Sequence, residues 1–111
     1  MQKDDSARSI VIVAYKPKPG KDEDLMTLTR EHVPLLRSEG LATDRPVVVA
    51  RAVDGTLIEV FEWEVGGARK AHSNPAVLKL WERYWDACTP VPLNSLPEAA
   101  AMFAGFAPVE F

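Results

Sequence analysis

The chain has 111 residues, 47% hydrophobic and 26% charged, which is typical of one globular domain and excludes disordered and fibrous classes. Its 13 basic and 16 acidic residues give a net charge of −3, so no basic excess indicates a nucleic-acid or acidic-lipid partner. The apolar run 10–15 is far too short to span a membrane, no apolar signal segment opens the chain, and the single Cys88 excludes an internal disulfide, so we expect a cytoplasmic protein.

A polar segment and then a strand begin the chain. Residues 1–8 are polar, and we predict a flexible arm there, followed by a single domain over residues 9–111. Residues 9–15 (SIVIVAY) are mostly β-branched and have no helical polar period, which predicts a buried strand. The two prolines and the glycine within 16–20 end this strand, because proline lacks the ladder donor and glycine permits a turn.

An amphipathic helix is predicted from Lys21 to about Glu39. Three consecutive acidic residues occupy its first turn, where the helix dipole favours negative charge. Leu25, Leu28 and His32 follow one another at helical spacing and form one stripe, which predicts that this face packs against a sheet. The histidine is the polar member of an otherwise apolar face.

A hairpin follows the helix. The apolar segments 46–53 and 56–65 predict two strands, and Asp54-Gly55 between them is a strong signal for a tight antiparallel turn. Side chains alternate between the two faces of a strand, so five residues of the second segment point toward the helices. These residues are Leu57, Glu59, Phe61, Trp63 and Val65.

The remaining elements are a second helix and a proline-rich tail. Asn74-Pro75 supplies an N-cap and a proline at the first helical position, which predicts a helix that ends near Cys88. In the tail, residues 96–103 favour a short helix and 106–111 a short edge strand. We take this last segment as the final strand of the domain.

The predicted order is strand, helix, strand, strand, helix, strand. This βαββαβ order is that of the α+β, ferredoxin-like fold, a four-stranded antiparallel sheet with both helices on one face. The first strand is apolar on both faces, yet the helices cover only one face of the sheet. A second copy of the sheet is the simplest cover for the other, so we expect a homodimer, a dimeric α+β barrel.

The chain also resembles a known family over residues 10–85, the antibiotic-biosynthesis-monooxygenase-like branch of the dimeric α+β barrel proteins. The resemblance rests on a first strand that ends in the turn Pro19-Gly20-Lys21, on a hairpin strand that ends in Glu62-Trp63-Glu64, and on a short helix that closes with His72 before Asn74-Pro75. The resemblance implies cofactor-independent monooxygenation of a small phenolic or polyketide-like aromatic, in which a protein base forms an electron-rich anion that reduces oxygen directly.

Two departures from the family pattern bear on this expectation. Phe61 stands two residues before Trp63, where the family has an acidic residue. The first strand also lacks the asparagine that haem-degrading relatives use together with Trp and His, which counts against haem degradation.

Two histidines are the candidate bases. The resemblance places His72 at the mouth of a pocket between sheet and helices; the alternative is that it caps the following Asn74-Pro75 helix start. His32 faces the sheet and is suited to act as a base or to orient a ligand hydroxyl. Its alternative role is a structural bond to a backbone carbonyl, such as that of Arg30.

The other candidates surround the same expected pocket. Glu59 lies on an apolar strand face, where a carboxylate needs a partner or a proton, and it is either a third catalytic residue or an ion-pair partner of Arg51. Trp63 is suited to stack on a flat ligand, and its alternative role is core packing. Arg51, Tyr15 and Tyr84 complete the set of candidate substrate-binding residues.

Three functions therefore remain open at this point. The first is a cofactor-independent monooxygenase, and the second an isomerase or lyase that only moves protons. The third is a non-catalytic small-molecule-binding or stress-related dimer, because one scaffold hosts many functions. With two histidines and one cysteine, we expect no metal site and no cofactor.

Overall fold

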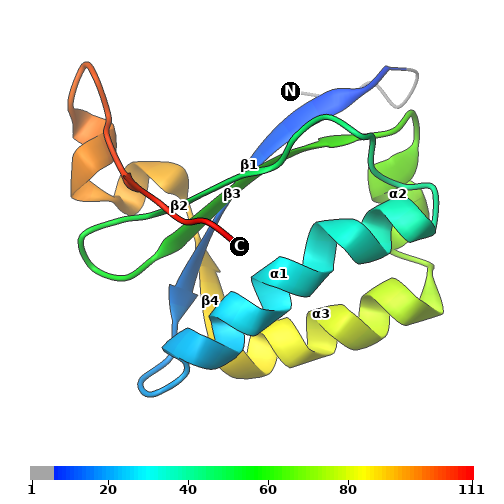
Figure 1. Cartoon of the computed structure of the whole chain (residues 1–111), viewed down its shortest axis with the longest axis horizontal. Helices are drawn as coiled ribbons and strands as arrows, with labels where there is room; N and C mark the ends of the chain where they lie inside the picture. The colour runs from blue at the N-terminus through cyan, green and yellow to red at the C-terminus, as the bar shows by residue number, and fades with distance from the viewer. Residues whose placement is uncertain (1–6) are drawn as a thin grey trace.

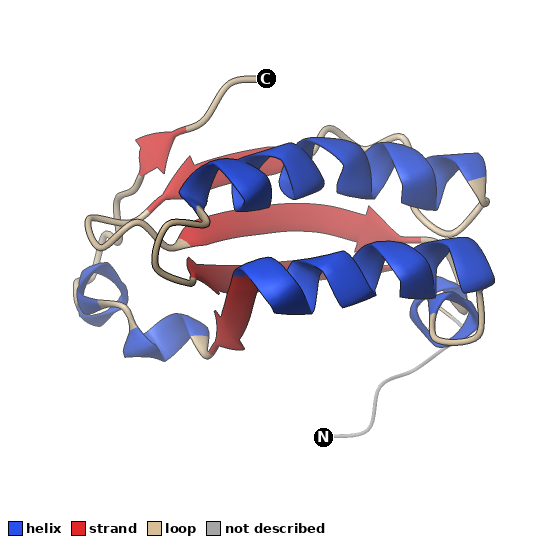
Figure 2. Cartoon of the chain, turned by 90° about the horizontal axis from the view of Figure 1, so that it is seen from below, coloured by secondary structure: helices blue, strands red, loops and turns tan. Residues whose placement is uncertain are grey.

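The structure, a computed structural model, describes residues 7–111 and shows an α+β fold with one antiparallel sheet of five strands. In sheet order β4-β1-β3-β2-β5, the strands are Cys88–Val91, Ser9–Pro17, Leu57–Trp63, Val48–Arg51 and Ala107–Pro108. The helices α1 (Asp22–Ser38) and α3 (Pro75–Ala87) lie side by side over one face of this sheet, and the short helix α2 (Gly67–Ala71) precedes α3 (Figures 1 and 2).

The two long predicted helices and the hairpin are confirmed, whereas the tail segment 96–103 forms only a short 3-10 helix over Pro97–Ala100. Helix α1 begins one residue after Lys21 and ends at Ser38, with its acidic residues in the first turn. Helix α3 is capped as the sequence predicts, since the Asn74 side chain accepts a hydrogen bond from the Val77 backbone N–H at 3.1 Å, with Pro75 at the first helical position. β2 and β3 pair in antiparallel fashion on either side of the Asp54-Gly55 turn.

The prediction of four strands was wrong, because the strand next to the first one was missed. β4 follows α3 directly and pairs with β1, with Pro90 opposite Tyr15. Proline is tolerated there because β4 is an edge strand with one side free of ladder bonds. The tail strand expected at 106–111 is instead the two-residue β5, which pairs with Ala50 and Arg51 at the opposite edge of the sheet.

The main core lies between the sheet and the two long helices. Four of the five residues predicted to face the helices are buried, and they are Leu57, Glu59, Phe61 and Trp63. The prediction was wrong for Val65, which lies beyond the end of β3 and is 48% exposed. Leu57 packs with Leu25 and Leu28 of α1. Phe61 and Trp63 pack with other apolar residues of α1 and with Val77 of α3. This layer contains the candidate site.

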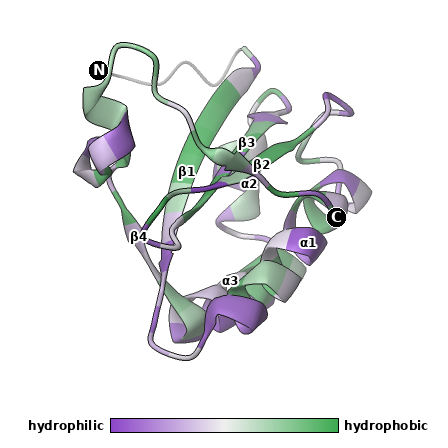
Figure 3. Ribbon diagram, turned by 60° about the vertical axis from the view of Figure 1, so that its left-hand side comes forward, coloured by the Kyte–Doolittle hydropathy of each residue, from purple (hydrophilic) through white to green (hydrophobic). Residues whose placement is uncertain are grey.

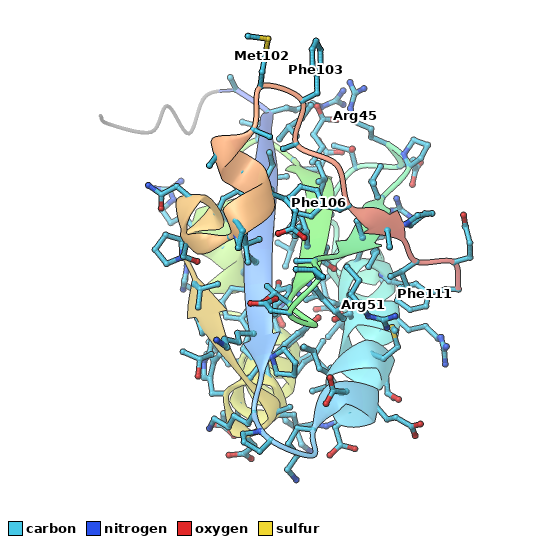
Figure 4. All side chains as sticks on the ribbon, turned by 90° about the vertical axis from the view of Figure 1, so that its left-hand side faces the viewer. Arg45, Arg51, Met102, Phe103, Phe106 and Phe111 are labelled. Atoms are coloured by element: carbon cyan, nitrogen blue, oxygen red, sulfur yellow. The ribbon has the colours of Figure 1, made fainter. Side chains whose placement is uncertain are left out.

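The other face of the sheet is covered in part by the tail of the same chain. Leu96 of the tail is buried against Ala14 and Ile58, and Phe106 packs on the same cluster. Figure 4 shows the tail crossing this face, with Phe106 over the strands and the almost fully exposed Met102 and Phe103 pointing away from the body of the molecule. The cover that we expected from a second copy is therefore supplied partly within one chain.

Three apolar residues of this face stay more than half exposed. They are Ile10, Ile12 and Val48, on β1 and β2. Figure 3 shows that most of the β1 ribbon is hydrophobic.

At the start of the described chain, the Arg8 guanidinium Nε donates to Glu64 Oε1 at 3.3 Å, and residues 1–6 of the predicted arm lie outside the described residues. No helix of the described chain is long and apolar enough to cross a membrane.

Candidate functional site

A cavity of about 200 Å³ lies between the sheet and the helices, and we name it the aromatic pocket. Both histidines, both tyrosines and all three tryptophans of the chain contribute to its wall. Its full lining is Val11, Val13, Tyr15, His32, Phe61, Trp63, His72, Trp81, Tyr84 and Trp85. Aromatic and aliphatic surface thus dominates a concave site that also holds two imidazole rings.

A fully buried carboxylate and an imidazole meet beside this pocket. The Glu59 side chain of β3 has 0% of its surface exposed, and His32 of α1 has 3%. His32 Nδ1 lies 2.9 Å from Glu59 Oε1 and 3.2 Å from Oε2. The Tyr15 hydroxyl of β1 donates to Glu59 Oε1 at 2.9 Å. Two donors from two other elements therefore converge on the carboxylate.

A hydrogen bond from Trp81 determines which nitrogen of the His32 ring carries the proton. The Trp81 indole Nε1–H lies 3.0 Å from His32 Nε2, and an indole nitrogen only donates. Nε2 is therefore an acceptor without a proton. The ring proton is on Nδ1, and this N–H donates a hydrogen bond to the Glu59 carboxylate. We name Tyr15, Glu59, His32 and Trp81 the buried network, in which both ring nitrogens of His32 are engaged.

The two tyrosines of the pocket are protonated donors. Burial, and next the charge of Glu59, raise the pKa of Tyr15 well above its ordinary value. Burial and then the same charge raise the pKa of Tyr84 as well. Tyr84 donates to the Thr29 hydroxyl at 3.2 Å, and its ring stacks on that of Tyr15 with centroids 4.8 Å apart. Neither phenol is suited to serve as a base near neutral pH.

His72 differs from His32 in its exposure to solvent and in its hydrogen bonding. It lies at the end of α2 and is exposed at the rim of the pocket, with its ring centroid 5.0 Å from that of Trp81. Within residues 7–111 its ring nitrogens make no hydrogen bond, and the N-cap bond of α3 is made by Asn74. Its imidazole is therefore available to a molecule in the pocket.

The structure does not bring Arg51 to the pocket. Arg51 lies opposite Leu57 in the β2–β3 register, whereas Glu59 lies opposite Val49. Two residues along a strand correspond to about 6.8 Å, and Glu59 is bonded to His32 and Tyr15 instead of Arg51. Arg51 borders a separate, charged hollow beside the first turns of α1, together with Asp22 and Arg30.

The sequence analysis missed Trp81 as a polar residue of the site. Trp81 lies on α3, one turn before Tyr84, and its ring borders the pocket. The indole N–H reaches His32 only because α1 and α3 pack against each other, and no pattern within one segment shows that contact. The signal available in the sequence was His32, the polar member of an otherwise apolar helix face.

Comparison with known proteins gives no match: no family model, no curated protein and no solved structure is significantly similar to the chain. Among the residues that the structure describes, no three His, Cys, Asp or Glu side chains gather as a metal-binding group.

Proposed function

We propose that the aromatic pocket binds a small, flat molecule of one or two aromatic rings. The observation that carries this proposal is the lining of the cavity, which brings together every tryptophan, tyrosine and histidine of the chain. An apolar cavity of roughly 150 Å³ binds benzene, and this one is about 200 Å³ and opens to solvent beside His72. Aromatic rings at edge-to-face and stacked angles favour a planar ligand.

For the bound molecule we propose a phenol, and for the reaction a monooxygenation without a cofactor. A hydroxyl at the rim would donate its proton to the unengaged ring of His72, which leaves an electron-rich phenolate in the pocket. The phenolate then transfers an electron to dioxygen, and the two radicals combine as a ring peroxide that takes back the proton from His72. Loss of water from this hydroperoxide leaves a new carbonyl on the ring, so one oxygen atom enters the product and the other leaves as water. The resemblance of the sequence to the antibiotic-biosynthesis-monooxygenase-like proteins supports this reaction, and so does the βαββαβ order of the elements, which we interpret as a ferredoxin-like fold with an added edge strand.

One observation favours a second candidate, binding without turnover. Both ring nitrogens of His32 are engaged, and Tyr15 is held protonated by its surroundings. Among the residues that the structure describes, His72 is therefore the histidine that can accept a proton without the loss of an existing hydrogen bond. If His72 does not accept a proton from the ligand, the pocket serves as a binding site for an aromatic molecule. A proton-moving isomerase or lyase would use the same base but would consume no oxygen.

We also propose that two copies associate through the sheet face opposite the helices, as a dimeric α+β barrel. Ile10, Ile12 and Val48 remain more than half exposed there after the tail has covered Ala14 and Ile58. A second copy of this face offers matching apolar surface, as a two-fold interface requires. The pocket is formed within one chain, so this association and the binding of a ligand are separate proposals.

Tryptophan fluorescence tests binding, because all three tryptophans line the pocket. We expect titration with 2-naphthol to change the emission in a saturable manner. Val13→Phe places an extra ring in the pocket and should weaken binding, whereas Ile12→Phe, on the opposite face of the same strand, should not. The absence of a saturable change, or an equal loss in both variants, would contradict the proposed pocket.

Oxygen uptake tests the reaction. With 1,4-dihydroxynaphthalene and oxygen-18-labelled dioxygen, we expect the wild-type chain to consume oxygen faster than the uncatalysed reaction and to place one labelled atom in the product. His72→Ala should lose most of this excess. If binding is retained but no excess uptake is seen, the monooxygenase proposal fails and the binding function stands.

A further inference from the structure

We propose that Nε2 of His32 is a recognition site for a hydroxyl group of the ligand, and that the Trp81 indole N–H occupies this site when the pocket is empty. This inference rests on the proposed binding of an aromatic molecule in the aromatic pocket. It adds a specificity: the pocket should prefer a ring with a hydroxyl directed inward to His32, a position separate from the rim, where a second hydroxyl would face His72. Trp81 is then a positioning residue that holds the site closed.

The first support is the arrangement of His32 and Glu59. A carboxylate that accepts the Nδ1–H of a histidine fixes the tautomer and leaves the Nε2 lone pair as the acceptor, as in catalytic Ser-His-Asp sites. Glu59 takes this position at 2.9 Å from Nδ1, and Tyr15 in turn orients Glu59. Burying such a carboxylate is costly, and apolar residues at these positions would stabilise the core at least as well. Stability alone therefore does not explain why His32 and Glu59 lie here.

The second support is the position of Trp81. Its ring is half-buried and borders the pocket, with His32 on one side and the exposed His72 on the other. Since the indole is in contact with solvent, its N–H can donate to water once it leaves His32. When a ligand hydroxyl replaces the indole, the Trp81 N–H donates to water and the ligand O–H donates to His32 Nε2. Both donors keep a partner, and His32 Nε2 accepts a hydrogen bond before and after the exchange.

Two properties follow from this exchange. A ring without a hydroxyl has nothing to offer Nε2, so it should bind with the Trp81–His32 bond intact. A ring with a hydroxyl must break that bond, and it gains an O–H···N bond in return. Removing the indole donor while keeping an aromatic ring should therefore favour the hydroxylated ligand selectively.

Nuclear magnetic resonance of nitrogen-15-labelled wild-type protein tests the exchange directly, with 2-naphthol and naphthalene as probes. We expect 2-naphthol to shift the Trp81 indole N–H signal and to increase its exchange with water, and we expect the His32 Nε2 signal to respond. Naphthalene should perturb the pocket signals and leave the Trp81–His32 bond in place. If both probes bind and neither alters this bond, the inference is overturned.

A pair of variants provides an independent arm. Trp81→Phe should raise the affinity for 2-naphthol relative to naphthalene by about 2- to 10-fold, the range expected for one net hydrogen bond. Trp85→Phe changes a tryptophan of the same wall that has no bond to His32, and its affinity ratio should equal that of the wild type. Equal changes in both affinities on Trp81→Phe would contradict the subsite. If neither probe perturbs any pocket signal, the proposed function itself fails, and the subsite fails with it.

Discussion

Glu59 is the residue that sets the chemistry of the interior. A fully buried carboxylate persists only where hydrogen bonds compensate for lost hydration, and here Tyr15 and His32 supply them. The same three residues connect β1, β3 and α1. The buried network is therefore a structural link between sheet and helix, and three of its members, Tyr15, His32 and Trp81, line the pocket.

Removal of the Glu59 carboxylate should destabilise the fold, because it leaves the Tyr15 hydroxyl and the His32 N–H buried without an acceptor. We expect Glu59→Ala to lower the free energy of unfolding by about 3–5 kcal/mol. Tyr15→Phe removes one donor and should cost about 1–2 kcal/mol. Urea denaturation followed by circular dichroism gives both values. A Glu59→Ala variant within ~1 kcal/mol of the wild type would show that the network contributes little.

The raised pKa values of Tyr15 and Tyr84 predict how stability depends on pH. In the unfolded chain both phenols lose their protons near the ordinary value of 10, whereas in the folded chain they retain them to higher pH. The unfolded state then binds fewer protons, so the free energy of unfolding falls as pH rises above about 10. Below pH 10 this contribution is present in full.

Tyrosinate absorbance provides the measurement, since the chain has two tyrosines. We expect it to appear together with the loss of circular dichroism, in one alkaline transition. A gradual rise near pH 10 with the fold intact would show that the two phenols are accessible to solvent. In Tyr15→Phe the alkaline loss of stability should be smaller.

Among the elements, α2 depends on the absence of a side chain at Gly67. A Cβ built there would overlap the backbone carbonyl oxygen of Leu41 and press on the Trp63 ring. The absence of a side chain at Gly67 therefore allows α2 to lie close to Leu41 and to Trp63 at the end of β3. Backbone cannot yield as a flexible side chain does, so accommodation requires α2 to move.

We therefore expect Gly67→Ala to lower the free energy of unfolding by about 1–3 kcal/mol. Gly105→Ala is the matched control, because a Cβ at Gly105 meets no atom within 4 Å. Chemical denaturation of the two variants measures the difference. Equal stability of Gly67→Ala and Gly105→Ala would mean that α2 shifts without cost.

Local patterns predicted the long elements well and the short edge strands poorly. Helices α1 and α3 and the hairpin carry their own caps, turn and periodicity, so they were predicted to within a few residues. β4 is four residues long and contains Pro90, and it becomes a strand only through pairing with β1. Strand alternation placed Glu59 and Trp63 on the helix side. The bond from Trp81 depends on helix packing, and the position of Arg51 depends on strand register.

At the scale of the whole molecule, the sheet has an open apolar surface on each of its two sides within residues 7–111. One is the aromatic pocket under the helices, and the other is the exposed face of Ile10, Ile12 and Val48. We assign the first to a ligand and the second to another copy of the chain. The two assignments are tested by different measurements.

Light scattering after size-exclusion chromatography tests the association. We expect the wild type to show twice the mass of one chain and Ile12→Lys to show the mass of one chain, because a charge on this face opposes its burial. Val53→Lys, at an exposed loop residue, should keep the wild-type mass. A wild type with the mass of one chain would exclude the dimer and leave the pocket proposal intact.

The location of a bound aromatic ring is the most direct test of the central claim. We predict that nuclear Overhauser contacts from bound 2-naphthol reach Val13, Phe61 and Trp81, which surround the aromatic pocket. Contacts confined to Ile10, Ile12 or the exposed Met102 and Phe103 would show that the probe binds the opposite face of the sheet, and that result would contradict the account.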